Sequence, residues 1–328
     1  MPLSARGQVF GSLSAAFDRP HDWRRSDREL LETFAAVTAQ ALDRIRAREA
    51  EQRANRVARQ FSEALQRSLL TDPLQPDHLQ LAVRYQPAAE EAQVGGDWYD
   101  AFLVRDGGTC LVIGDVAGHD QHAAAAMGQL RNLLRGIGYT VGEPPAHVLG
   151  ELDRAMRDLA VGTLATAVLA RIEQTDRQAA DGTRTLRWSN AGHPPPLLIG
   201  LDGTVELLSR PADLLLGLDP ETDRSDHTQL LVPGATVLLY TDGLVERRGM
   251  PLDEGLDRLV GTARRLARLP LEALCDALLD ELATDVEDDV SLLALRAHPE
   301  DRPRPTGAVR RAAPPRTGRA RPRWSPAR

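Results

Sequence analysis

The chain has 328 residues, 42% of them hydrophobic, and a formal net charge of −7. That length suggests about two domains with ample apolar material for a core, and an acidic body disfavours nucleic acid as the main ligand. Because there is no long apolar run and no export leader, we expect a soluble cytoplasmic protein without membrane contact. Cys110 and Cys275 lack metal-ligand spacing and predict buried free thiols in a reducing compartment.

The N-terminal residues predict a strand followed by a helix. Residues 7–18 have a mixed strand pattern, with no partner strand before them. The capping-box pattern Ser26–Glu29 should then start a helix, because its side chains can satisfy free backbone N–H groups. Apolar residues recur after it at helical spacing and form one broad face.

The helical pattern continues well beyond an ordinary domain helix. A thinner apolar stripe at nearly heptad spacing follows the first one. We expect a helix from about Ser26 to Leu70, roughly 65 Å long at about 1.5 Å per residue. Two shorter helices broken near Ala50 are the alternative. A helix of this length cannot bury itself in one domain, so we interpret it as a connecting rod that could pair with a second copy in a homodimer.

From about His78 to Arg296, short strands are mixed with helices. Because the strands come in consecutive groups, the pattern favours an α+β layered fold over a doubly wound parallel sheet. We expect strands at Leu79–Tyr85, Trp98–Val104, Thr109–Ile113, Ala165–Glu173, Thr185–Ser189, Pro196–Ile199, Thr204–Leu208, Ala235–Tyr240 and Val290–Arg296, and helices at His122–Ile137, Pro145–Leu159, Leu252–Ala267 and Leu271–Ala283.

The last thirty or so residues are rich in Pro, Arg, Ala and Gly and show no periodicity, which predicts disorder. From Glu300 onward the tail carries nine arginines and two acids. DNA binding through this tail is one hypothesis, and salt-sensitive binding lost on tail deletion would support it. We prefer a solvated tail that binds no nucleic acid.

Acidic residues recur at the ends of the predicted buried strands. Asp97 and Asp115 flank one apolar run, Asp242 follows the strand ending at Tyr240, and an Asp-Asp pair precedes the last strand. Each alone is an ordinary turn residue. If the strand ends converge, the carboxylates would repel one another unless a cation joined them. Mg²⁺ and Mn²⁺ prefer such oxygen ligands, and no His/Cys set at zinc spacing competes.

Five separated motifs stand in order along the chain: VGGDWYD, IGDVAGH, SNAGHPPPLLI, LLYTDGLVE and EDDVSLLAL. In their order and their residues they resemble the bacterial SpoIIE-type phosphatases. These belong to the metal-dependent protein phosphatase superfamily, which also contains eukaryotic protein phosphatase 2C. The resemblance covers about residues 60 to 297. It implies an α-β-β-α sandwich, in which helices flank two central β-sheets, preceded here by the long helix and a partial GAF-like segment.

The resemblance also implies a site with two Mn²⁺ or Mg²⁺ ions. Asp115 would be the bridging ligand, with the backbone carbonyl of Val116 beside it. Asp97 would hold the metal water shell or ligate directly, and Asp242 and Asp288 would complete the second metal. The implied reaction is hydrolysis of phosphoserine or phosphothreonine by a metal-bridging hydroxide that attacks phosphorus in line, without a phosphoenzyme.

Some positions depart from the eukaryotic pattern or stay open. Asp288 is preferred over Asp289 because the family's ligand is the first residue of the pair. Ala117 stands where the eukaryotic enzymes carry a proposed general acid, and His119 cannot be assumed to replace it, so leaving-group protonation is left to water. The phosphate-binding arginine of those enzymes has no clear counterpart. We interpret His193 as pinning a turn between two strands, with a role at the edge of the active site as the alternative.

Residues 7–50 resemble the last strands and final helix of a GAF domain, a small-ligand sensor, through GSLSAAFDRP followed by SDRELLETFAAVTAQAL. A complete GAF domain is much longer, so either the true start lies upstream, which we favour, or a remnant persists. We therefore divide the chain into a GAF-like remnant (1–50), a helical linker (51–76), a phosphatase domain (77–297) and a disordered tail (298–328).

In this family the substrates are often phosphorylated STAS-domain antagonists of anti-sigma factors. The resemblance suggests such a substrate here, whose dephosphorylation would free a sigma factor. The long helix would transmit regulation by a population shift between inactive and active arrangements. The alternative is a non-catalytic scaffold that binds a phosphoprotein without turnover, and the intact set of acids disfavours it.

Overall fold

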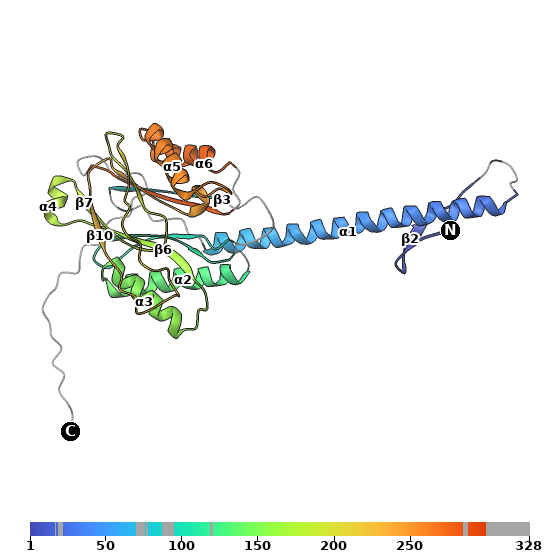
Figure 1. Cartoon of the computed structure of the whole chain (residues 1–328), viewed down its shortest axis with the longest axis horizontal. Coiled ribbons are helices and arrows are strands. Elements are labelled where there is room, and N and C mark those ends of the chain that lie inside the picture. Colours follow the sequence, from blue (N-terminus) through green and yellow to red (C-terminus); the bar gives the residue numbers. More distant parts are fainter. Residues whose placement is uncertain are drawn as a thin grey trace, which may run out of the picture. The chain divides into compact units, whose positions relative to one another are not determined.

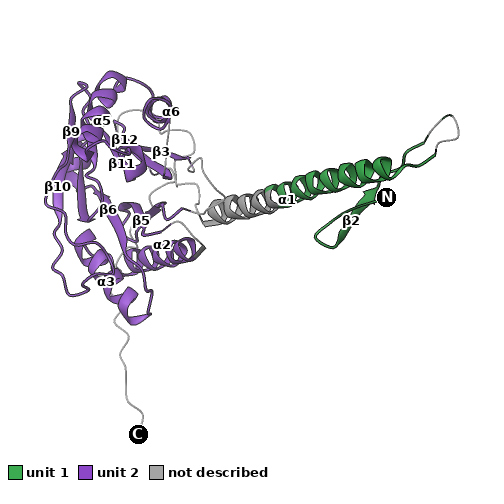
Figure 2. Ribbon diagram, turned by 45° about the vertical axis from the view of Figure 1, so that its right-hand side comes forward, with its two compact units in different colours: residues 1–63 green, residues 64–328 purple. Residues whose placement is uncertain are grey.

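The computed structural model describes residues 1–16, 18, 22–69, 76, 78–86, 95–118, 121–284 and 288–299, without the side chains of residues 51, 54–69 and 121. The chain divides into two compact units, Met1–Glu63 and Ala64–Arg328, which are described separately (Figure 2). Within the described ranges, no helix combines the length and apolar character needed to cross a membrane. The predictions for His119 and for the tail from Glu300 lie outside these ranges.

In the N-terminal unit a two-stranded hairpin packs on a helix. β1 (Pro2–Ala5) pairs antiparallel with β2 (Gln8–Ser12). The expectation of an unpaired strand over 7–18 was therefore wrong. The turn residues Arg6 and Gly7 both have positive φ, 45° and 80°, which is the backbone twist that closes a tight hairpin. The lone glycine was too weak a signal to predict that turn.

α1 (Arg25–Leu69) is a single helix of 45 residues (Figure 1). It confirms the unbroken helix over the alternative with a break near Ala50. The helix begins one residue earlier than predicted, and the Asp27 carboxylate accepts the backbone N–H of Arg24 at 3.1 Å. Ser26 therefore lies in the first turn and is not the cap, so that part of the capping-box prediction was wrong.

The C-terminal unit contains two five-stranded sheets whose neighbouring strands all run antiparallel. The first sheet has the order β10-β7-β6-β5-β4, and the second has the order β3-β12-β11-β8-β9. The strands of the first sheet are β4 (Trp98–Leu103), β5 (Thr109–Val116), β6 (Ala165–Glu173), β7 (Arg184–Ala191) and β10 (His227–Leu231). Those of the second are β3 (Leu79–Gln86), β8 (Leu197–Ile199), β9 (Val205–Leu207), β11 (Thr236–Tyr240) and β12 (Val290–Ala297).

Helices cover the outer faces of both sheets (Figure 1). α2 (Gln121–Val141) and α3 (Pro145–Asp158) pack on the first sheet, while α5 (Leu252–Leu266) and α6 (Leu271–Leu282) pack on the second. The short helices α4 (Asp176–Asp181) and η1 (Asp242–Leu244) complete the described elements. This arrangement confirms the predicted α-β-β-α sandwich.

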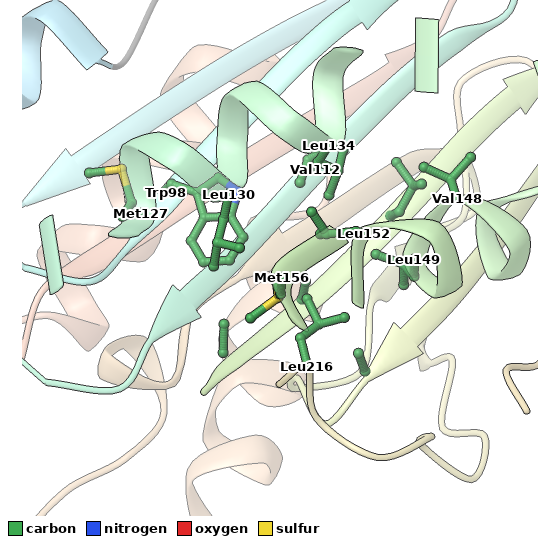
Figure 3. Packing of buried hydrophobic residues seen from close by; sticks show 14 of the residues in the cluster. Trp98, Val112, Met127, Leu130, Leu134, Val148, Leu149, Leu152, Met156 and Leu216 are labelled. Carbon is green, nitrogen blue, oxygen red and sulfur yellow. The ribbon is translucent and has the colours of Figure 1, made fainter. Parts of the chain in front are cut away.

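The layers explain why the central strands are apolar on both sides. Along β11, Val237 and Leu239 face the core between the sheets, whereas Leu238 and Tyr240 face the core under α5 and α6. Successive strand residues point to opposite faces, so a strand covered on both faces has no polar side. On the other side of the sandwich, Trp98 lies under the apolar face of α2 (Figure 3).

All the predicted strands and helices of this unit are present, with bounds shifted by a few residues. The prediction missed β10, α4 and the short helix η1. β10 is an edge strand that pairs with β7 alone and leaves Leu230 exposed, so its pattern carries little apolar signal. α4 has no buried residue, and the side chain of Thr175 and the left-handed Gly182 define its two ends.

Candidate metal centre

Three aspartates from different strand ends meet between the two sheets. Asp97 directly precedes β4, Asp115 lies near the end of β5, and Asp242 follows β11 at the start of η1. Each offers a carboxylate oxygen, and these oxygens lie within 4.8 Å of one another. β4 and β5 are neighbours in the first sheet and β11 belongs to the second, so the cluster depends on how the sheets are stacked.

Glycines let the backbone approach the cluster closely. A Cβ on Gly96 would lie 2.1 Å from the carbonyl oxygen of Val116 and 2.5 Å from Oδ1 of Asp115. Both distances are far below van der Waals contact, so a larger residue would force the loop away. The same geometry places the Val116 carbonyl, the predicted backbone ligand, against the loop that carries the carboxylate of Asp97.

A hydroxyl between the sheets holds Asp97 in place. Thr241 Oγ1 donates to Asp97 Oδ2 at 2.7 Å and accepts from the backbone N–H of Ser291 at 2.8 Å. Asp97 is 2% exposed, and Thr241 is fully buried. This hydrogen bond joins the first sheet to the second beside the acids. Thr241 was not among the predicted site residues, although its place directly before Asp242 could have singled it out.

Burial and mutual repulsion make the acids hard to ionise. Burial raises the pKa of Asp97 well above its ordinary value, and the charge of Asp115 raises it further. Burial likewise raises the pKa of Asp115 to about 8, with Asp242 and Asp288 adding to the effect. Burial also raises the pKa of Asp242 to about 6, and Asp288 contributes there too.

These carboxylates fit a divalent cation. Oδ1 of Asp242 is buried and has no hydrogen-bond partner among the described residues. An orphaned carboxylate oxygen facing two further acids is costly without a counter-charge, and hard cations such as Mg²⁺ and Mn²⁺ take oxygen ligands of this kind. The donor set therefore suits a divalent cation.

The two aspartates before β12 have different surroundings. Asp288 is exposed and, with Asp242, lines a cavity of about 500 Å³. Asp289 is buried, accepts the hydroxyl of Tyr85 at 2.5 Å, and adds to the raised pKa of Asp97. A Cβ on Gly95 would lie 1.5 Å from Oδ2 of Asp289, so this carboxylate also reaches the glycine loop.

The remaining predicted residues have clear places. His193 is buried in the turn after β7, where Asn190 bonds to its backbone N–H and carbonyl, both at 2.8 Å. The side chain that holds this turn is therefore that of Asn190, and the imidazole of His193 has its partners on other strands. Trp98 is part of the hydrophobic core under α2. Both cysteines are buried free thiols, and Ala117 is exposed.

Comparison with known proteins agrees with this architecture. Residues 105–298, more than half of the chain, match the family Stage II sporulation protein E (SpoIIE), and residues 1–42 match the GAF domain. The relative Protein IcfG of Synechocystis sp. is 27% identical over 281 residues, which cover 76% of this chain and 43% of IcfG.

Two solved structures are similar. The RsbU and RsbW domains of Rv1364c from Mycobacterium tuberculosis are 33% identical, with a TM-score of 0.61 over 69% of this chain and 63% of that one. The SiaA-PP2C domain of Pseudomonas aeruginosa is 26% identical, with a TM-score of 0.59 over 75% of this chain and 98% of that domain. The chain thus spans less than two thirds of IcfG and of the mycobacterial chain. Because the family match covers most of the sandwich and the fold agrees with it, this protein belongs to the SpoIIE family of PP2C-like phosphatases.

Proposed function

We propose that this chain is a metal-dependent protein serine/threonine phosphatase whose active centre is the aspartate cluster. Asp97, Asp115 and Asp242 would hold two divalent ions, with Asp288 and the Val116 carbonyl completing the ligand set. The observation that carries the proposal is the meeting of three carboxylates within 4.8 Å. When bound, Mn²⁺ or Mg²⁺ would neutralise charge on the phosphoryl oxygens and activate a water for attack on phosphorus.

The residues around the cluster have separate tasks in this reaction. Thr241 holds the Asp97 carboxylate by donating a hydrogen bond to it. Gly96 leaves room beside the Val116 carbonyl. The cavity next to Asp242 would receive the phosphorylated side chain, since it opens beside the acids and is also lined by Glu246, Arg247, Arg248, Met250 and Leu252. The departing serine or threonine oxygen would take its proton from water, because the exposed Ala117 offers no acid.

We propose a phosphorylated regulatory protein as the substrate, and within that class a STAS-domain antagonist of an anti-sigma factor. The mycobacterial relative supports this choice because it joins an RsbU domain to an RsbW domain. A cytoplasmic setting, which such a partner requires, is compatible with two buried free thiols.

We also propose that the chain forms a homodimer through α1. In the N-terminal unit, one face of this helix buries Ala35 and Ala39 against the hairpin. Leu30, Phe34 and Val37 are more than half exposed and follow a four-then-three spacing, which suits a second helix. Sedimentation equilibrium of the whole chain tests this: the wild type should dimerise and Phe34→Glu should shift it toward monomer. A wild type that stays monomeric at micromolar concentration contradicts it.

Phosphate release tests the proposed activity. The wild type should release phosphate from p-nitrophenyl phosphate and from a phosphoserine peptide when Mn²⁺ is supplied. EDTA or Asp115→Asn should abolish release, whereas Asp257→Asn, an exposed acid on α5, should not change it. A folded, Mn²⁺-loaded wild type that binds the phosphopeptide without releasing phosphate would instead support the scaffold alternative.

A further inference from the structure

The imidazole of His193 lies between the two sheets close to the aspartate cluster. His193, in the connection between β7 and β8, is 5% exposed. Its Nδ1 lies 2.8 Å from Oγ1 of Thr166 in β6, and its Nε2 lies 3.1 Å from the carbonyl oxygen of Tyr240 in β11. β6 belongs to the first sheet and β11 to the second, so this ring is hydrogen-bonded to both.

The partners determine which ring nitrogen carries the proton. The Tyr240 carbonyl can only accept, so Nε2 is the donor. Burial lowers the pKa of His193 to about 3, so the ring is neutral and Nδ1 accepts the hydroxyl proton of Thr166. Both ring nitrogens are therefore satisfied, and the ring has one donor and one acceptor pointing to opposite sheets.

The backbone of His193 is held independently of its ring. Asn190 Nδ2 donates to the His193 carbonyl, and the His193 N–H donates to Asn190 Oδ1. Asn190 is the penultimate residue of β7, which pairs with β6. The ring therefore extends from a turn that is fixed to the first sheet.

The two hydrogen-bonded partners are next to the acids. Thr166 is the cross-strand neighbour of Asp115 in the β5–β6 ladder. Tyr240 is followed by Thr241, which donates to Asp97, and then by Asp242. The ring thus bonds to the strand that pairs with the Asp115 strand and to the segment that carries Asp242.

We infer that His193 is a positioning residue that ties β6 to β11 and thereby sets the separation of the Asp115 and Asp242 carboxylates. This inference rests on the proposed metal site, for which that separation decides how well both acids reach the same ion. Removing a residue that orients metal ligands without touching the metal typically changes metal affinity by about 10- to 100-fold.

Titration calorimetry of Mn²⁺ into the chelator-stripped whole chain tests this inference. His193→Ala should weaken Mn²⁺ affinity at least about tenfold. His193→Gln, which keeps one donor and one acceptor, should recover part of that loss. The matched control is Ile172→Ala, a buried truncation on β6 about 20 Å from Thr166 at about 3.3 Å per residue. It should lower thermal stability and leave Mn²⁺ affinity within about twofold of the wild type.

A second pair of variants covers the case in which His193→Ala does not fold. Thr166→Val removes only the hydroxyl that bonds Nδ1, and Thr166→Ser retains it. Weaker Mn²⁺ binding in the valine variant with recovery in the serine variant supports the inference. Unchanged affinity in folded His193→Ala or in Thr166→Val overturns it while the proposed function stands. A wild type that binds no Mn²⁺ overturns both.

Discussion

Replacing Asp115 by asparagine should stabilise the metal-free protein. The carboxyl has an ordinary pKa of 3.8, which burial and the neighbouring acids raise to about 8 in the folded chain. A raised folded pKa means that the native state holds a proton that the unfolded state has released. The corresponding stability is fully present below about pH 4 and is lost as the pH rises through about 8.

The size of the effect follows from the shift. Each pKa unit corresponds to about 1.4 kcal/mol, so a rise from 3.8 to about 8 is on the order of 5 kcal/mol at pH 8. An asparagine amide has no charge to ionise, but its burial still has a cost. We therefore expect Asp115→Asn to recover at least about 2 kcal/mol at pH 8. For a domain of this size that raises Tm by about 4 °C or more.

Thermal and urea unfolding of the chelator-treated chain at pH 5 and pH 8 measures this difference. The wild type should be less stable at pH 8, and Asp115→Asn should lose less stability between the two pH values. Saturating Mn²⁺ should stabilise the wild type at pH 8 and leave the variant unchanged, because a ligand stabilises only the state that binds it. A variant less stable than the wild type at pH 8 without metal, with Asp257→Asn unchanged, would refute the reasoning.

Three further substitutions test other parts of the structure. Gly96→Ala should abolish Mn²⁺-dependent phosphate release, because its Cβ would lie 2.1 Å from the Val116 carbonyl oxygen; a calorimetric Mn²⁺ titration should show the same loss. Thr241→Val should lower Mn²⁺ affinity and reduce the free energy of unfolding in urea by about 1–3 kcal/mol, because it removes the hydroxyl that donates to Asp97 and accepts from the Ser291 N–H. Thr241→Ser, which keeps the hydroxyl, should behave like the wild type. Arg224→Ala should lower the free energy of unfolding in urea by about 3–5 kcal/mol, because it removes the ion-pair partner that lies 2.5 Å from the buried carboxylate of Asp153 in α3. A loss of stability below about 1 kcal/mol would contradict that pairing.

The local patterns predicted most of the C-terminal unit but not its long-range contacts. Asp97, Asp115 and Asp242 could be found because each stands at the end of an apolar strand. That they meet depends on strand order and on the stacking of two sheets, which no local pattern encodes. Thr241 could have been singled out by its place before Asp242, but its hydrogen bond to Asp97 depends on the same stacking of the sheets.

The sequence pattern also could not show which way the side chains of Asp288 and Asp289 point. Adjacent residues beside a strand point to opposite sides, so the register of β12 against β3 decides which side each one takes. In that register Asp289 reaches Tyr85, whereas Asp288 faces the cavity beside Asp242. The motif indicated Asp288 as the ligand, and Asp288 lines the same cavity as Asp242. Its role as a ligand stays a prediction.

The location of bound Mn²⁺ tests the central claim most directly. Crystals of the whole chain grown with Mn²⁺ should show anomalous scattering at the manganese edge between the carboxylates of Asp97, Asp115 and Asp242. Strong peaks elsewhere in the chain, with none at this cluster under saturating Mn²⁺, would contradict the claim that these acids form a metal centre.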